Sequence, residues 1–154
     1  MVLGNPKAPI TIIKWTDYQW PHCKKVLSLR KQIIEKYPSD VRFVIKHFPL
    51  SFHKQAKKAA LYSLAAERQG KFLEMERMIY ENIQELKNNE DLPRQYAEQL
   101  GLDMVQLDRD MEDRELETRI ITDMVQMRQS GIPRMSVPKF LINGKEPQGG
   151  RNIE

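Results

Sequence analysis

The sequence predicts an α/β fold in which one β-sheet is interrupted by a long helical insertion. Three observations support it: a strand–helix–strand pattern over residues 10–48, helical periodicity over residues 53–129, and a β-hairpin signal near residue 143. The hairpin strands must join the first sheet to bury their apolar face. We therefore expect a sheet domain of residues 1–52 and 130–154 with an all-helical sub-domain, 53–129, inserted between its two segments.

Residues 10–48 have the pattern of a β-α-β unit. Ile10–Trp15 is rich in β-branched residues and follows two prolines, as expected for a strand. Pro21 suits the first position of the next helix, because the N–H that proline lacks would have no helical partner there. We expect one long helix ending at Pro38 and a second strand over Val41–Phe48. The helix has apolar residues at helical spacing: Val26, Leu27, Leu29, Ile33, Ile34 and Tyr37.

The segment from His53 to about Gln129 has helical periodicity and no alternating strand pattern. Gly70 separates its first two helices, and Gly101 follows a short helix as a C-cap. Asp103 is the expected N-cap of the next helix. A final long helix should end at Gly131.

Strand character returns at Lys139–Ile142, followed by Asn143-Gly144. Asn-Gly is the dipeptide most typical of a two-residue hairpin turn. We therefore expect a short partner strand after the turn, toward Gly149.

The chain of 154 residues carries a net charge of +4, with a sequence pI near 9.2. We interpret its basic clusters as solvated helix faces and expect no nucleic-acid partner, because no nucleic-acid motif accompanies them. No segment approaches the roughly 20 apolar residues of a membrane span. Residues 1–6 lack the features of a signal peptide, so none is expected in this chain. The basic clusters are Lys24, Lys25, Arg30 and Lys31, and Lys54, Lys57 and Lys58.

Cys23 is the single cysteine, so the chain cannot form an internal disulfide. The histidines, His22, His47 and His53, do not have the short, regular spacing of a structural zinc site. We expect neither a metal nor a cofactor.

Several short motifs occur in one order along the chain, and together they resemble the DsbA-like branch of the thioredoxin superfamily. The resemblance runs from about Pro9 to Arg151. In that branch a strand leads through an aromatic-rich turn into Cys-Pro-His-Cys. The matching segments here are Trp15-Thr16-Asp17-Tyr18-Gln19, Trp20-Pro21-His22-Cys23, His47-Phe48-Pro49-Leu50, Gln69-Gly70-Lys71-Phe72, Val137-Pro138 and Phe140-Leu141-Ile142-Asn143-Gly144.

The resemblance implies a thioredoxin fold and a protein thiol–disulfide oxidoreductase, with one departure in the redox motif. Trp20 occupies the place of the first cysteine, whose thiolate attacks a substrate disulfide. Indole is neither a nucleophile nor a leaving group, and Cys23 matches only the resolving cysteine. His22 and Pro21 match the residues between the two cysteines. Pro138, preceded by Val137, resembles the family's cis-proline, beside which substrate peptide binds.

Two interpretations of function follow. In the first, the chain is a DsbA-like oxidoreductase that is catalytically disabled as written, because Trp20 replaces the nucleophile. In the second, it is a non-catalytic peptide-binding or chaperone-like module. Cys23 can also be a small buried hydrophobic residue, and His22 an exposed residue without a thiolate to stabilise. Trp20 can belong to the core or be an exposed aromatic anchor.

The resemblance also implies partners and location. We expect polypeptides that carry thiols or disulfides, a redox partner protein, and a periplasmic or extracytoplasmic location. Family members continue into a helix that covers one face of the sheet, and Arg151–Glu154 has the look of a truncated start of that helix. A sheet face left uncovered would favour self-association.

Overall fold

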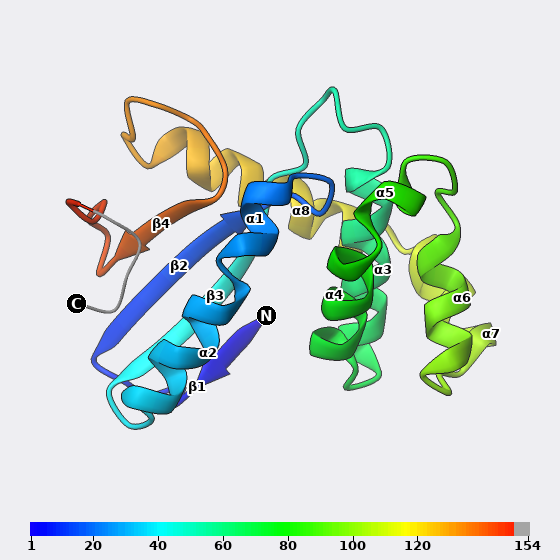
Figure 1. The fold of residues 1–154 in the computed structure, drawn as a ribbon, viewed down its shortest axis with the longest axis horizontal. Helices are drawn as coiled ribbons and strands as arrows, with labels where there is room; N and C mark the ends of the chain where they lie inside the picture. Colours follow the sequence, from blue (N-terminus) through cyan, green and yellow to red (C-terminus); the bar gives the residue numbers. More distant parts are fainter. Residues whose placement is uncertain (150–154) are drawn as a thin grey trace.

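A computed structural model describes residues 1–149 and shows a single sheet with helices on both faces and to one side (Figure 1). The four strands are ordered β1-β3-β2-β4. The central strands β2 and β3 are parallel, and both outer strands are antiparallel to their neighbours. This confirms the α/β class. The strands are β1 (Val2–Gly4), β2 (Ile10–Thr16), β3 (Val41–His47) and β4 (Lys139–Ile142).

The helix between β2 and β3 is broken, which corrects the expectation of one long helix. Its parts are α1 (Pro21–Lys25) and α2 (Leu27–Lys36), with Pro21 at the start of α1. Val26 lies at the break with φ −96° and ψ 6°. Cys23 packs into one hydrophobic cluster and Val26 into another. Because of the break, neighbouring helical turns pack into two different clusters. Apolar periodicity alone does not predict such a break.

Every element between β3 and β4 is a helix. Asp103 is the N-cap of α7, as predicted, and its carboxylate accepts a hydrogen bond from Gln106 N at 3.0 Å. Of the helices within residues 1–149, none is long and apolar enough to cross a bilayer. The division into two domains stays a prediction. The helices are α3 (Ala56–Arg68), α4 (Phe72–Glu81), α5 (Ile83–Leu86), α6 (Leu92–Gln99), α7 (Met104–Met111) and α8 (Arg114–Gln129).

The hydrophobic core has two parts. The larger cluster joins Trp15 on β2 and Leu141 on β4 to side chains of α3, α4 and α8. The smaller cluster places Phe43 and Ile45 of β3 under α2. Figure 1 shows α1 and α2 on one face of the sheet, with α3, α4, α6 and α7 grouped beside it. Helices therefore pack on both faces of the central strands. Self-association of the protein stays a prediction.

Strand β1 was not predicted. It pairs with β3 over three residues, too few for an alternating pattern to be recognised in the sequence. Gly4 has φ +80°, and a Cβ there would lie 2.6 Å from the Val41 carbonyl oxygen. Glycine is required at this position because the chains approach closely and φ is positive.

The hairpin after β4 is shorter than predicted. Asn143 and Gly144 both have positive φ, 46° and 81°, as an Asn-Gly hairpin turn requires. Instead of a partner strand, a single β-bridge joins Ile142 to Lys145. Pro147 follows, and proline cannot donate to a strand ladder. The expected start of a helix at Arg151–Glu154 lies outside the described residues.

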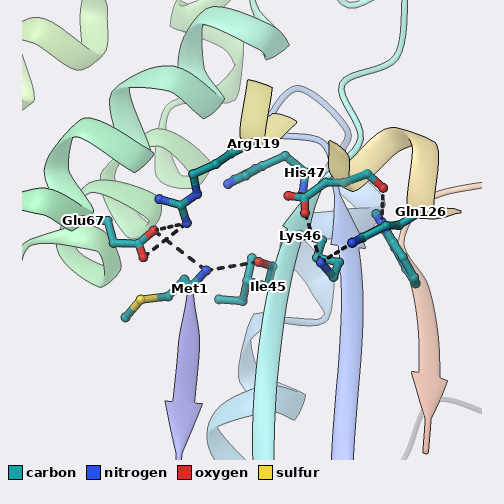
Figure 2. A network of polar contacts seen from close by, with 9 residues as sticks. Met1, Ile45, Lys46, His47, Glu67, Arg119 and Gln126 are labelled. Atoms are coloured by element: carbon teal, nitrogen blue, oxygen red, sulfur yellow. Dashed lines mark hydrogen bonds and ion pairs between the residues drawn. The ribbon is translucent and has the colours of Figure 1, made fainter. Parts of the chain in front are cut away.

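A polar network fixes α8 across the end of β3 (Figure 2). The Asp123 carboxylate accepts hydrogen bonds from Lys46 Nζ at 3.1 Å and from His47 N at 2.9 Å. Lys46 Nζ also donates to Gln126 at 2.6 Å. These bonds hold α8 beside the loop that follows β3. A second set of polar contacts links Arg119 of α8 to Glu67, Glu67 to the Met1 amino group, and that group to the Ile45 carbonyl oxygen.

Candidate functional site

The site is built where β2 ends and α1 begins, which we call the Trp20 turn (residues 17–23). Trp20 is the N-cap of α1 with extended backbone angles, φ −95° and ψ 111°, and its side chain makes no capping hydrogen bond. Trp20 N donates to the Asp17 carbonyl oxygen at 3.3 Å, and Cys23 N donates to the Trp20 carbonyl oxygen at 2.9 Å. The indole thus occupies the position beside the first-turn amides where a thiolate would be stabilised.

Cys23 is completely buried behind this turn. Its Sγ accepts a hydrogen bond from Asp17 N at 3.4 Å, and Lys14 Nζ donates to its carbonyl oxygen at 3.5 Å. Burial is the main cause that raises the pKa of the Cys23 thiol. A buried thiol with a raised pKa is a poor nucleophile, because only the thiolate reacts.

The buried Asp17 carboxylate ties the Trp20 turn to the loop after β3. One carboxylate oxygen accepts from Gln19 N at 2.7 Å. The other accepts from Leu50 N at 2.7 Å and is paired with His53 Nδ1 at 2.9 Å. The sequence motifs did not predict this role for Asp17. A local signal existed, because an Asp side chain bonded to the amide two residues on is an Asx turn.

A second pair of bonds joins the same two segments. Gln19 Nε2 donates to Gln55 Oε1 at 3.0 Å, and Gln55 N donates to Gln19 Oε1 at 2.7 Å. Gln19 is 4% exposed and Gln55 is half-buried, so both bonds are partly sheltered from water. The Trp20 turn and the loop after β3 are therefore held together by the side chains of both Asp17 and Gln19.

Trp20 lies between the core and the surface. It is partly buried against the larger cluster. Its ring also contacts those of His22 (centroid distance 5.0 Å), His53 (5.4 Å) and, edge-on, Phe52 (6.5 Å). Phe52 is 67% exposed, and His22 is exposed as well. The position of the missing thiol is thus covered by an aromatic surface.

The Val137–Pro138 peptide bond is cis in the structure. Lys139, the next residue, pairs with Trp15, so Pro138 lies beside the end of β2 from which the Trp20 turn departs. Val137 is buried in the cluster that contains Cys23. Pro138 is buried too, whereas Met135, three residues earlier, is 49% exposed. The structure therefore brings this segment to the same end of the sheet as the turn.

His47 is a buried titratable group near the site. It is 1% exposed, and neither ring nitrogen has a hydrogen-bond partner in the described part of the chain. Its ring lies 5.7 Å from that of Tyr18, measured between centroids. Burial lowers the pKa of His47 to about 3.

This histidine should make the protein less stable in mild acid. Because the folded pKa of about 3 is below the ordinary histidine pKa of about 6.5, the unfolded chain binds a proton in mild acid that the folded chain does not bind. Above pH 6.5 the imidazole is neutral in both states and does not lower the free energy of unfolding. As the pH falls from 6.5 toward 3, protonation of the unfolded chain lowers that free energy progressively. The free energy of unfolding should decrease by up to about 1.4 kcal/mol per pH unit between pH 6.5 and 4.5.

Urea unfolding at several pH values tests this, with His47→Leu as the comparison. The variant should show a clearly shallower dependence on pH over the same range. Equal slopes in the two proteins would show that His47 does not cause the loss of stability.

The fold and site together define a thioredoxin-like protein: a parallel β-α-β unit, an antiparallel β4 after a cis-proline, and a helix N-terminus at the end of the central strand β2. The thioredoxin family matches residues 1–154, and the chain belongs to that family.

Solved structures refine this class. A thioredoxin-like oxidoreductase from Silicibacter pomeroyi DSS-3 is 28% identical with a TM-score of 0.77, covering 92% of this chain and 79% of that one. A variant of alpha-DsbA1 from Wolbachia pipientis is 25% identical with a TM-score of 0.74, covering 92% and 72%. The structural neighbours are thus DsbA-like thiol–disulfide oxidoreductases, as the motifs predicted.

Curated relatives include larger proteins. Na(+)/H(+) antiporter NhaA 3 of Salinispora tropica is 32% identical over 154 residues. The match covers 99% of this chain but 23% of the antiporter, so the chain spans less than a quarter of that relative.

Proposed function

We propose that this chain is a DsbA-like member of the thioredoxin family that binds polypeptides at the Trp20 turn but does not exchange disulfides in this form. The observation that carries the proposal is Trp20 itself. It stands at the N-cap of α1, half-buried and in contact with exposed aromatic rings.

The absence of exchange follows from the chemistry of the site. An exchange cycle needs an attacking thiolate and a second thiol that resolves the mixed disulfide. Trp20 supplies neither, and Cys23 alone is fully buried with a raised pKa. A mixed disulfide at Cys23 would require the turn to open and would have no second thiol to release it.

Binding is supported by the surface that remains. Trp20 and Phe52 offer aromatic area, and aromatic anchors are enriched at the energetic centres of interfaces. The segment before Pro138, with exposed Met135, lies at the same end of the sheet. Unfolded or disulfide-bearing polypeptides and a redox partner protein are the proposed partners. An extracytoplasmic location is proposed with them, on the DsbA-like relationship.

The second candidate function is that of an active DsbA-like thiol–disulfide oxidoreductase. If a form of this protein has cysteine at position 20, then Pro21, His22, Cys23 and Pro138 supply the rest of the redox motif. Sequencing the native gene at this position separates the candidates directly.

The Trp20→Ala variant tests the binding proposal. A permanently unfolded probe, reduced and carboxymethylated insulin B chain, should bind the parent and bind Trp20→Ala about tenfold more weakly, as for loss of an interface anchor. Val105→Ala is the matched control, because Val105 is an exposed apolar residue on α7. Fluorescence anisotropy gives both affinities. The proposal fails if the parent does not bind the probe or if both variants lose affinity equally.

A further inference from the structure

A groove opens beside the Trp20 turn, between the loop after β3 and helix α8. Its volume is about 460 Å³, and apolar side chains form most of its wall, among them Leu50, Phe52, Ile121 and Met124. Phe52 and Ile121 are 67% and 51% exposed and lie together on this groove, and a contiguous exposed apolar surface is typical of an interaction site. Exposed Val125 extends the same side of α8.

The charges along this groove are all of one sign. Its described lining residues include Lys54, Lys57 and Arg128, and no aspartate or glutamate. Lys57 is paired with Glu117. Lys54 and Arg128 are exposed and form no ion pair within residues 1–149, and Arg128 lies over the Phe48 ring at 5.5 Å. An apolar floor with cations at its rim is complementary to an apolar ligand that carries carboxylates. We call this feature the basic groove.

The basic groove is continuous with the site. Phe52 and His53 line it, and the rings of both contact the ring of Trp20. The Asp17 hydrogen bonds hold the same loop against the Trp20 turn. A chain that lies on Trp20 can therefore pass into the groove without a gap in the contact surface.

We propose that the basic groove selects acidic polypeptide segments in which an apolar side chain is flanked by Asp or Glu. This inference rests on the proposed function and names its substrate class. A volume of about 460 Å³ suits a few buried side chains, and the recessed floor fits an inserted anchor. A lipid surface is the weaker fit, because a bilayer is entered by protruding apolar groups and leaves a recess unfilled.

Three short peptides with one common label test the proposal by fluorescence anisotropy. Each has a central Leu-Phe pair, flanked by Asp and Glu, by Asn and Gln, or by Lys. The acidic peptide should bind the parent about tenfold more tightly than its amide counterpart and show the steepest loss of affinity with added salt, because salt screens exposed charges. The lysine peptide should bind most weakly.

Charge reversal in the basic groove supplies the second measurement. Lys54→Glu/Arg128→Glu should lose about tenfold affinity for the acidic peptide and little for the amide peptide. The single variant Lys54→Gln, which is milder for folding, should show a smaller loss in the same direction. The matched control is Lys7→Glu/Lys36→Glu, two exposed lysines at the other end of the sheet.

The outcomes separate this inference from the proposed function. If acidic and amide peptides bind equally and Trp20→Ala weakens both, the Trp20 site binds polypeptides and the acidic preference is wrong. If no peptide and no carboxymethylated insulin B chain binds, the proposed function fails. Vesicles of phosphatidylserine and phosphatidylcholine that displace the acidic peptide and bind in a manner dependent on Lys54 and Arg128 would make the groove a lipid site and overturn the inference.

Discussion

Replacing Trp20 with cysteine should raise insulin reduction well above the uncatalysed rate, whereas we expect the parent to stay at that rate. The new thiol would stand at the N-cap of α1, one helical turn from Cys23. The amides of the first turn should favour its thiolate, so its pKa should fall below the free value of about 8.5. Cys23 would then have the partner it lacks.

Two measurements on Trp20→Cys and the parent test whether a cysteine at position 20 supplies disulfide exchange. Thiolate absorbance against pH gives the pKa of the new thiol, and insulin turbidity gives the rate. Trp20→Ser is the control, because it removes the indole without adding a thiol. A normal thiol pKa with no turnover would mean that more than position 20 has been lost. Turnover by the parent would contradict the role assigned to Trp20.

Removing the guanidinium of Arg30 should lower the free energy of unfolding by about 3–5 kcal/mol, the range for breaking a buried ion pair. Arg30 on α2 donates two hydrogen bonds to the Glu76 carboxylate on α4, at 2.7 and 3.0 Å. The Glu76 side chain is 1% exposed and that of Arg30 12%. In Arg30→Met the carboxylate would stay buried without this partner. The pair also lines a cavity of about 630 Å³ between the two helices.

Urea unfolding of three variants tests the buried pair. Arg30→Met should be strongly destabilised, and Arg30→Met/Glu76→Leu should recover much of the loss, because the double variant no longer buries that carboxylate. Lys31→Met is the matched control, since Lys31 is 77% exposed and its pair with Glu35 is a surface contact. A loss in Arg30→Met no greater than in Lys31→Met would show that the pair does not stabilise the fold.

Local patterns predicted much of the fold. The β-branched run at β2, the proline at the start of α1, the Asp103 cap and the Asn-Gly turn each act within a few residues, and the structure has all four. The broken helix at Val26 and the short strand β1 were missed. Both depend on contacts with distant residues, which periodicity does not record.

The same distinction applies to the site. The motif located Trp20, Cys23 and Pro138, because these positions are fixed within short segments of the chain. It did not reveal that Asp17 reaches Leu50 and His53, more than 30 positions away. Nor did it reveal the basic groove, whose walls come from a loop and from α8. Such partners become visible only when the chain is folded.

The Asp17 hydrogen bonds have a consequence for how this protein can change. They shape the Trp20 turn through backbone amides and through the side chains of Asp17 and Gln19. The hydrogen bonds of residue 20 within the turn use its N–H and carbonyl, which any side chain other than proline at this position would keep. The hydrogen bonds that shape the turn are therefore independent of the side chain at position 20. We therefore expect a mutation at position 20 to change the chemistry of the site while these hydrogen bonds stay in place.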